Sequence, residues 1–170
     1  MPPPDSTITV EERDVLNLAR DWRGAATGDL ETVSPHRIVH RFIKLWISFN
    51  ALYTLHSPNQ AREKPQLEAL AKWQPFVDSH SARLGQDTYL HALRVLDDPG
   101  VYSYIRRARV RIPAPHSPHD SLLATYQVRC NLFHGRKHPA DMRDGQLIQA
   151  SSVLVSAWVD DLLAYDGPWA

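Results

Sequence analysis

The segment over residues 35–56 is the most apolar part of the chain, and it limits the possible folds more than any other feature. Ser34 and Pro35 supply an N-cap and a proline at the first helical position, and Ser57-Pro58 marks the end. Its apolar side chains form one wide helical stripe: Ile38, Phe42, Ile43, Leu45, Trp46, Ile47, Phe49, Leu52 and Tyr53. A helix that is apolar over more than half of its circumference needs other helices around it. The sequence therefore predicts a central helix in a bundle.

Two further long helices are predicted near the ends of the chain. Thr9 and Glu12 form a capping box, so a helix is expected from there to about residue 23, followed by a linker over 24–33. The expected inward positions of this first helix are Val15, Leu18, Ala19 and Trp22. The last helix is expected over 142–164. Its expected inward side chains are Leu147, Ile148, Leu154, Val155, Trp158 and Leu162.

Shorter elements are predicted in the middle of the chain. A short helix is expected from Pro65 to residue 73 and is ended by Pro75, and a second one is expected over 87–96. The sequence Asp97-Asp98-Pro99-Gly100 is typical of a turn and closes that second helix.

Another main helix is predicted near residue 120. Asp120 is expected to cap a helix over 121–133 or 121–134, and Gly135 then stands where a left-handed C-terminal cap belongs. Residues 101–112 fit either a helix or an extended segment, because both periodicities are present there.

The predicted fold class is all-α: one domain over 1–170, with four main helices and short satellite helices. Leu (19 residues) and Ala (17) dominate while Gly contributes only 7, which favours helices over a turn-rich β fold. Residues 1–8 are expected to form a flexible tail.

Charge is distributed unevenly, although 19 Lys and Arg residues balance 19 Asp and Glu residues. The net charge is −4 over 1–35, +2 over 36–100, +6 over 101–140 and −4 over 141–170. Such a local basic field fits a phosphate-bearing partner, and a solvated basic surface is the alternative. Tyr102 or Tyr104 offers a stacking face beside it. The basic residues expected to bind RNA are Arg106, Arg107, Arg109, Arg111, Arg136 and Lys137.

No metal, cofactor or membrane is expected. Cys130 is the single cysteine, so no internal disulfide can form. His36 and His40 lie one helical turn apart without a carboxylate at metal-site spacing, which favours solvent-facing histidines. No stretch is long and apolar enough to span a bilayer, and residues 1–5 lack the features of a signal peptide. We therefore expect a cytoplasmic protein.

Arg129 and His134 are the best candidates for chemistry. Histidine serves as acid or base near neutral pH, and arginine can hold two phosphate oxygens. The R-x4-H spacing alone is uninformative, because Arg111 and His116 repeat it in a proline-rich loop. Taken alone, Arg129 is better explained as a helix-surface or buried ion-pair arginine, and His134 as a side chain that caps the C-terminus of the helix.

The surrounding sequence adds a resemblance. The segments Phe42-Ile-Lys-Leu-Trp-Ile-Ser-Phe-Asn-Ala-Leu-Tyr53 and Tyr126-Gln-Val-Arg-Cys-Asn-Leu-Phe-His-Gly135 resemble the HEPN superfamily, in particular its Apea-like branch. The resemblance covers about 35–56 and 120–164, roughly 40% of the chain. It implies a helical bundle, often dimeric. It also implies a metal-independent ribonuclease whose R-x4-6-H pairs face each other across the dimer cleft.

The resemblance also implies roles for single residues. Arg129 takes the place of the family's arginine and His134 that of its histidine. Cys130 occupies a position that is often Asn, Asp or His in the family, so Asn131 becomes the candidate auxiliary group. Asn50 and Tyr126 are expected to support the pair without contacting RNA, and a hydrogen bond between helices is the alternative for Asn50.

Two functions remain open from the sequence. The first is a metal-independent RNA endonuclease acting as a homodimer, a toxin or antiviral defence effector with an antitoxin or defence-system partner protein. The second is a non-catalytic HEPN dimerisation module that binds a nucleotide or a partner protein. The intact Arg129 and His134 pair favours the first, whereas overall neutrality and Cys130 favour the second. A toxin branch that carries a modified tyrosine after the histidine is disfavoured, because Arg136 occupies that position.

Overall fold

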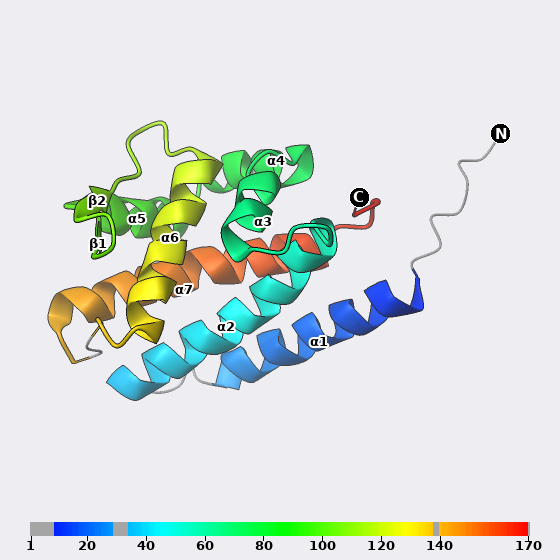
Figure 1. The fold of residues 1–170 in the computed structure, drawn as a ribbon, viewed down its shortest axis with the longest axis horizontal. Helices are drawn as coiled ribbons and strands as arrows, with labels where there is room; N and C mark the ends of the chain where they lie inside the picture. The colour runs from blue at the N-terminus through cyan, green and yellow to red at the C-terminus, as the bar shows by residue number, and fades with distance from the viewer. Residues whose placement is uncertain (1–8, 29–33, 138–139, 170) are drawn as a thin grey trace.

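The computed structural model describes residues 9–28, 34–137 and 140–169, and it confirms the all-α class (Figure 1). The expected tail over 1–8 lies outside the described residues, as does the linker segment 29–33. The elements in chain order are α1 (Val10–Thr27), α2 (Pro35–His56), α3 (Glu63–Leu70), α4 (Gln74–Arg83), α5 (Asp87–Asp97), β1 (Val101–Ser103), β2 (Ala108–Val110), α6 (Pro118–Phe133) and α7 (Met142–Leu163).

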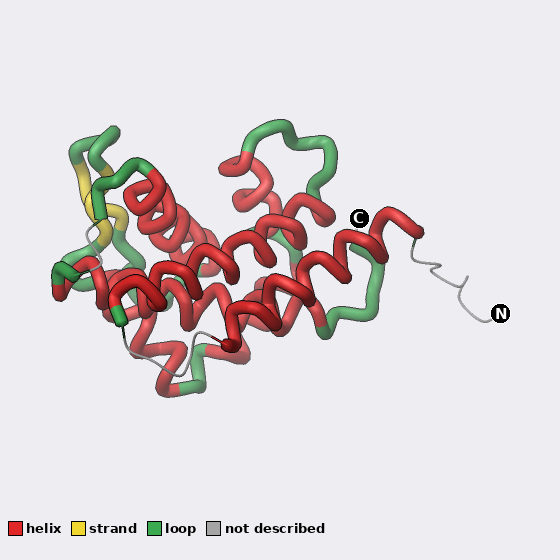
Figure 2. Tube along the Cα trace, turned by 90° about the horizontal axis from the view of Figure 1, so that it is seen from below, coloured by secondary structure: helices red, strands yellow, loops and turns green. Residues whose placement is uncertain are grey.

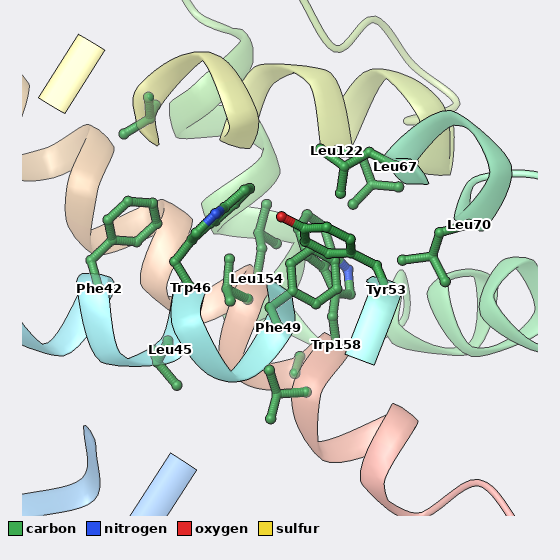
Figure 3. Packing of buried hydrophobic residues seen from close by; sticks show 14 of the residues in the cluster. Phe42, Leu45, Trp46, Phe49, Tyr53, Leu67, Leu70, Leu122, Leu154 and Trp158 are labelled. Atoms are coloured by element: carbon green, nitrogen blue, oxygen red, sulfur yellow. The ribbon is translucent and has the colours of Figure 1, made fainter. Parts of the chain in front are cut away.

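Helix α2 is the central helix that its sequence predicts. It packs against α1, α3 and α7, and α1 runs alongside it in Figure 1. The aromatic rings on its inner face pack against one another and against α7. The Phe49 ring centroid lies 5.2 Å from that of Tyr53 on the same helix and 5.5 Å from that of Trp158 on α7 (Figure 3). The fully or almost fully buried hydrophobic side chains of α2 are Phe42, Leu45, Trp46, Phe49, Leu52 and Tyr53. This aromatic face forms the centre of the core.

Helix α1 begins at the predicted capping box but is longer than predicted. The backbone N–H of Glu12 donates to Thr9 Oγ1 at 3.1 Å, and that of Thr9 donates to Glu12 Oε2 at 2.7 Å. Residues 24–27 are helical, so the linker predicted there is wrong. Tertiary contacts explain the extension, because Ala26 is buried in the core and Arg23, one turn earlier, forms a two-pronged ion pair with Asp160 of α7 at 2.7 and 2.9 Å.

The inward face of α1 also differs from the prediction. Leu16, Ala19 and Ala26 are buried, whereas Leu18 is 49% exposed. The buried face therefore shares Ala19 with the predicted stripe but is turned toward Leu16 and away from Leu18. Ala19 explains the fit, since its carbonyl accepts the Ser48 hydroxyl of α2 at 2.7 Å.

The short helices α3 to α5 confirm the prediction only in part. Helix α3 begins at Glu63 and ends at Leu70, two and three residues earlier than predicted. The sequence predicts that Pro75 ends a helix, but Pro75 lies in the first turn of α4. Helix α4 itself is not predicted. Proline is tolerated in a first turn because the N–H that it lacks has no partner inside the helix there. Helix α5 follows its prediction closely.

Residues 101–112 contain a β-hairpin, which settles the alternatives in favour of extended structure. Strand β1 pairs with β2 in antiparallel register, with Val101 opposite Val110. Gly100 precedes the hairpin at φ +91°, and a Cβ atom there would lie 2.8 Å from the Val110 carbonyl oxygen. Only glycine fits this approach. Figures 1 and 2 both place the hairpin at the end of the molecule opposite to the start of α1.

Helix α6 begins three residues before its predicted start. Ser117, not Asp120, is the N-cap, and its Oγ accepts the Asp120 N–H at 3.1 Å. Pro118 occupies the first turn, an arrangement that favours initiation at this point. Helix α7 confirms its predicted start at Met142, and all six side chains of its predicted inward stripe are buried.

A buried chain of hydrogen bonds connects α7, α5 and α4 to the loop before α6. Trp158 Nε1 donates to the Tyr89 hydroxyl at 2.7 Å, and that hydroxyl lies 2.8 Å from His80 Nδ1. His80 Nε2 lies 2.7 Å from the His116 carbonyl oxygen, which can only accept. His80 therefore carries its proton on Nε2 and accepts from Tyr89 on Nδ1, so the network is satisfied with a neutral imidazole.

This neutral histidine predicts a loss of stability in acid. Burial lowers the pKa of His80 below its ordinary value of 6.5, so the unfolded chain takes up a proton that the folded chain does not. The stabilisation of the folded state by neutral His80 is complete above pH 6.5 and is lost as the pH falls below that value. We expect the free energy of unfolding, measured with urea between pH 7.5 and 5.5, to fall less steeply with decreasing pH in His80→Gln than in wild type. The two slopes should differ by up to about 1.4 kcal/mol per pH unit. His91→Gln, an exposed histidine of α5, is the control, and equal pH slopes for wild type and His80→Gln would contradict the assignment.

Candidate functional site

Helix α6 carries both motif residues in its last turns and ends as predicted. Gly135 adopts φ +65°, and its N–H donates to the Leu132 carbonyl at 3.1 Å. The Arg136 N–H donates to the Asn131 carbonyl at 2.8 Å, which completes a Schellman motif. The chain leaves the helix here so that the Arg136 guanidinium lies 4.9 Å from the ring centroid of Tyr104 in the hairpin loop.

Arg129 is half-buried and held from two sides. Its Nη1 atom lies 3.2 Å from Glu63 Oε2 of α3, and its guanidinium carbon lies 4.7 Å from the ring centroid of Phe133. Its Nε atom is buried and has no hydrogen-bond partner in the part of the chain that the structure describes. The ion-pair interpretation of this arginine is thus realised in the structure, through an acid that lies 66 positions earlier in the sequence.

Glu63 belongs to a wider polar cluster. Its Oε1 atom accepts the indole N–H of Trp46 at 3.1 Å and the hydroxyl of Tyr53 at 2.7 Å. Figure 3 shows that hydroxyl pointing toward Trp46. Burial and the hydrogen bond to Glu63 raise the pKa of Tyr53 well above its usual range, so the phenol stays protonated and donates. Sequence reasoning missed Glu63, because no local pattern connects it to Arg129.

Asn50 and Tyr126, the predicted supporting residues, lie on either side of this cluster. The Asn50 amide donates to the Tyr53 hydroxyl, a partner on the same helix rather than on a neighbouring one. The Tyr126 ring centroid lies 6.4 Å from that of Trp46. Burial, together with the neighbouring Cys130 thiol, raises the pKa of Tyr126 to about 12. Both residues therefore reach Arg129 only through other side chains.

His134 differs from Arg129 in its exposure and in its side-chain contacts. It is the C-cap residue of α6 and is exposed, and its backbone N–H donates to the Cys130 carbonyl at 3.0 Å. Within the described ranges, its imidazole has no hydrogen-bond partner. The ring does not cap a helix carbonyl, which was the structural alternative. Its nitrogens are therefore accessible to a ligand.

Asn131, the predicted auxiliary residue, is buried and fully engaged. Its Nδ2 atom donates to the Tyr102 carbonyl at 2.8 Å, and its Oδ1 atom accepts from Gln127 at 2.8 Å. These contacts attach the hairpin to α6. Its amide is thus committed to the scaffold in this structure, and we assign it no chemical step.

The six predicted RNA-binding cations fall into two groups. Arg111 pairs with Asp97 at 2.8 Å, and Lys137 pairs with Asp144 and keeps only 8% of its side chain exposed. The other four gather with aromatic and aliphatic side chains on what we call the hairpin surface: Tyr102, Tyr104, Ile105, Arg106, Arg107, Arg109 and Arg136.

Contacts between rings and guanidinium groups organise the hairpin surface. The Tyr102 and Tyr104 rings meet edge to face with centroids 5.0 Å apart, and the Arg109 guanidinium lies 6.0 Å from the Tyr102 centroid. Arg109 also donates to the Gly100 carbonyl at 3.1 Å. Ile105 at the tip is 84% exposed. The surface therefore presents cations beside exposed ring faces, a combination suited to phosphates and bases.

No group of three or more histidine, cysteine or acidic side chains suited to a metal ion occurs among the described residues. His36 and His40 are both exposed on α2. In the same part of the chain, no helix combines the length and apolarity needed to cross a membrane.

No protein-family model, curated protein or solved structure matches this chain. The all-α class follows from the structure itself. The HEPN resemblance continues to depend on the motif residues of α2 and α6.

Proposed function

We propose that the protein is a metal-independent RNA endonuclease of HEPN type, with Arg129 and His134 as its catalytic residues. One arrangement supports this proposal above all others. The end of α6 combines an arginine held by Glu63, an exposed histidine whose imidazole has no hydrogen-bond partner among the described residues, and the attached hairpin surface. Together they offer a fixed cation, a proton-transfer group and a binding surface for a polyanion.

The chemistry follows from these groups. A base removes the proton of a ribose 2′-hydroxyl, and the 2′-oxygen attacks the adjacent phosphorus. The bond from phosphorus to the 5′-oxygen breaks as an acid protonates the leaving oxygen, which yields a 2′,3′-cyclic phosphate and a 5′-hydroxyl. His134 transfers protons, and Arg129 stabilises the charge that builds on the phosphoryl oxygens.

This mechanism favours a homodimer. Acid and base act in the same step, and one chain offers a single His134. A second copy related by two-fold symmetry supplies the second imidazole and the opposite wall of a cleft. The resemblance to HEPN ribonucleases implies the same arrangement.

The hairpin surface is proposed to hold the RNA beside the catalytic pair. Arg106 and Arg107 lie exposed in the hairpin loop, where they can contact phosphates. Tyr104 and Tyr102 provide ring faces for bases, which stack on aromatic side chains with little dependence on sequence. A toxin or antiviral effector in the cytoplasm, controlled by an antitoxin or defence-system partner protein, is the biological setting that the resemblance implies.

One observation favours the second candidate, a non-catalytic module that dimerises and binds a nucleotide or partner protein. Arg129 already has a carboxylate partner and a stacked ring, as a structural arginine would. In that case the hairpin surface alone would carry the function.

Catalytic variants separate the two candidates. His134→Ala and Arg129→Ala should each lower the single-turnover cleavage rate by about 10²-fold or more, because each removes a group needed in the transition state. Cleavage by wild type should persist in EDTA and leave 2′,3′-cyclic phosphate ends, as mass spectrometry would show. His119→Ala, an exposed histidine of the same helix, is the control. If His134→Ala folds by circular dichroism and cleaves like wild type, the ribonuclease assignment is wrong.

Changes at the hairpin surface should affect binding instead of chemistry. The double variant Arg106→Ala/Arg107→Ala should weaken RNA affinity and reduce the salt dependence of log K by up to about one unit per lost phosphate contact. The cleavage rate at saturating RNA should change little. The matched control is Arg13→Ala, an exposed arginine of α1. Unchanged affinity and salt slope in fluorescence anisotropy would remove the hairpin surface from the proposal.

Oligomeric state provides an independent check. Sedimentation at micromolar concentration should give about twice the chain mass of 19.3 kDa. A stable pair would bury roughly 1,600 Å² in total. A monomer under these conditions would contradict the two-histidine mechanism.

A further inference from the structure

Glu63 is a largely buried carboxylate at the start of α3. It is the first residue of α3, and only 19% of its side chain is exposed. Burial of a carboxylate is costly unless donors replace the lost water. Here two hydrogen-bond donors and one cation do so, and they come from two other helices: Trp46 and Tyr53 of α2 donate, and the Arg129 guanidinium of α6 forms an ion pair.

The two carboxylate oxygens of Glu63 have different partners. Oε1 accepts both donors from α2, which sets the plane and the direction of the carboxylate. Oε2 faces Nη1 of Arg129 at 3.2 Å. The aromatic face of the core therefore orients Glu63, and Glu63 in turn orients the guanidinium.

The guanidinium is held, yet its donors are not consumed. Glu63 contacts it as an ion pair and Phe133 packs against its face, but no hydrogen bond from an Arg129 N–H to any described residue is present. The buried Nε–H is a donor without an acceptor, which is unusual and unfavourable in a folded protein.

From these contacts we infer that Glu63 is a positioning residue for Arg129 in the proposed ribonuclease. It holds the guanidinium in one orientation before substrate arrives, so the cation is already aligned when charge develops on the phosphoryl oxygens. This inference rests on the proposed function. Glu63 itself touches neither the RNA nor the reacting atoms.

The test uses Glu63→Gln, whose carbonyl oxygen can still accept from Trp46 and Tyr53 while its amide no longer attracts Arg129. The single-turnover rate at saturating RNA should fall about tenfold or more, and the RNA dissociation constant should stay within about twofold. Glu68→Gln on the same helix, where the partner is Lys64, should behave like wild type. In an Arg129→Ala background, Glu63→Gln should cause no further loss.

A residue with only a structural role would give a different result. Glu63→Gln would then change the urea midpoint but leave the saturating rate unchanged, or its effect would add to that of Arg129→Ala. Either outcome overturns the inference. If Arg129→Ala cleaves like wild type, the proposed function fails separately.

Side-chain NMR tests whether Glu63 holds the Arg129 guanidinium, and it needs no cleavage activity. The ¹⁵N guanidinium signal that disappears in Arg129→Ala identifies Arg129. Rotation about its Nε–Cζ bond should be slow in wild type and Glu68→Gln and faster in Glu63→Gln. Equal rotation rates in all three proteins would show that Glu63 does not hold Arg129.

Discussion

Burial of the aromatic face of α2 is the constraint on which the other elements depend. The buried face of α2, with Phe49 and Trp46 on it, needs apolar partners, and α1, α3 and α7 pack against this helix. Two of the buried rings, however, carry polar atoms at their edge. The indole N–H of Trp46 and the hydroxyl of Tyr53 must be satisfied inside the protein, and Glu63 does this for both. The apolar core thereby places a carboxylate beside α6, and the position of Arg129 is a consequence of core packing.

Local sequence signals predict the parts of the fold that depend on local physics. The N-cap at Ser34, the capping box at Thr9 and the left-handed cap at Gly135 are all present, because each involves residues within a few positions of one another. The start of α6 is misplaced although its signals, Ser117 and Pro118, are local, whereas the end of α1 is misplaced for a tertiary reason. The extension of α1 depends on Arg23 and Asp160, which lie 137 positions apart.

The same distinction applies to the candidate site. The motif predicts Arg129 and His134 as candidates, and their location at the end of α6 follows from the predicted helix. The partner of Arg129 and the commitment of Asn131 to Tyr102 depend on contacts 66 and 29 positions away, which periodicity cannot reveal. The net charge of +6 over residues 101–140 misleads in a similar way. Asp97 and Asp144, both outside this segment, neutralise Arg111 and Lys137, so the effective field is confined to the hairpin surface.

The two motif residues have opposite environments, and this contrast fits a division of roles. Five residues along an ideal helix correspond to a rotation of about 140°, so the two side chains cannot share one face. Arg129 is directed toward α3 and held there, whereas His134 is exposed at the end of the helix. A cation that stabilises developing charge is most effective when it is fixed in advance, because no reorganisation is then needed. A proton-transfer group must instead reach water and substrate. Since one chain separates these groups, the proposed chemistry requires a cleft in which two chains meet, and dimerisation becomes a condition for activity.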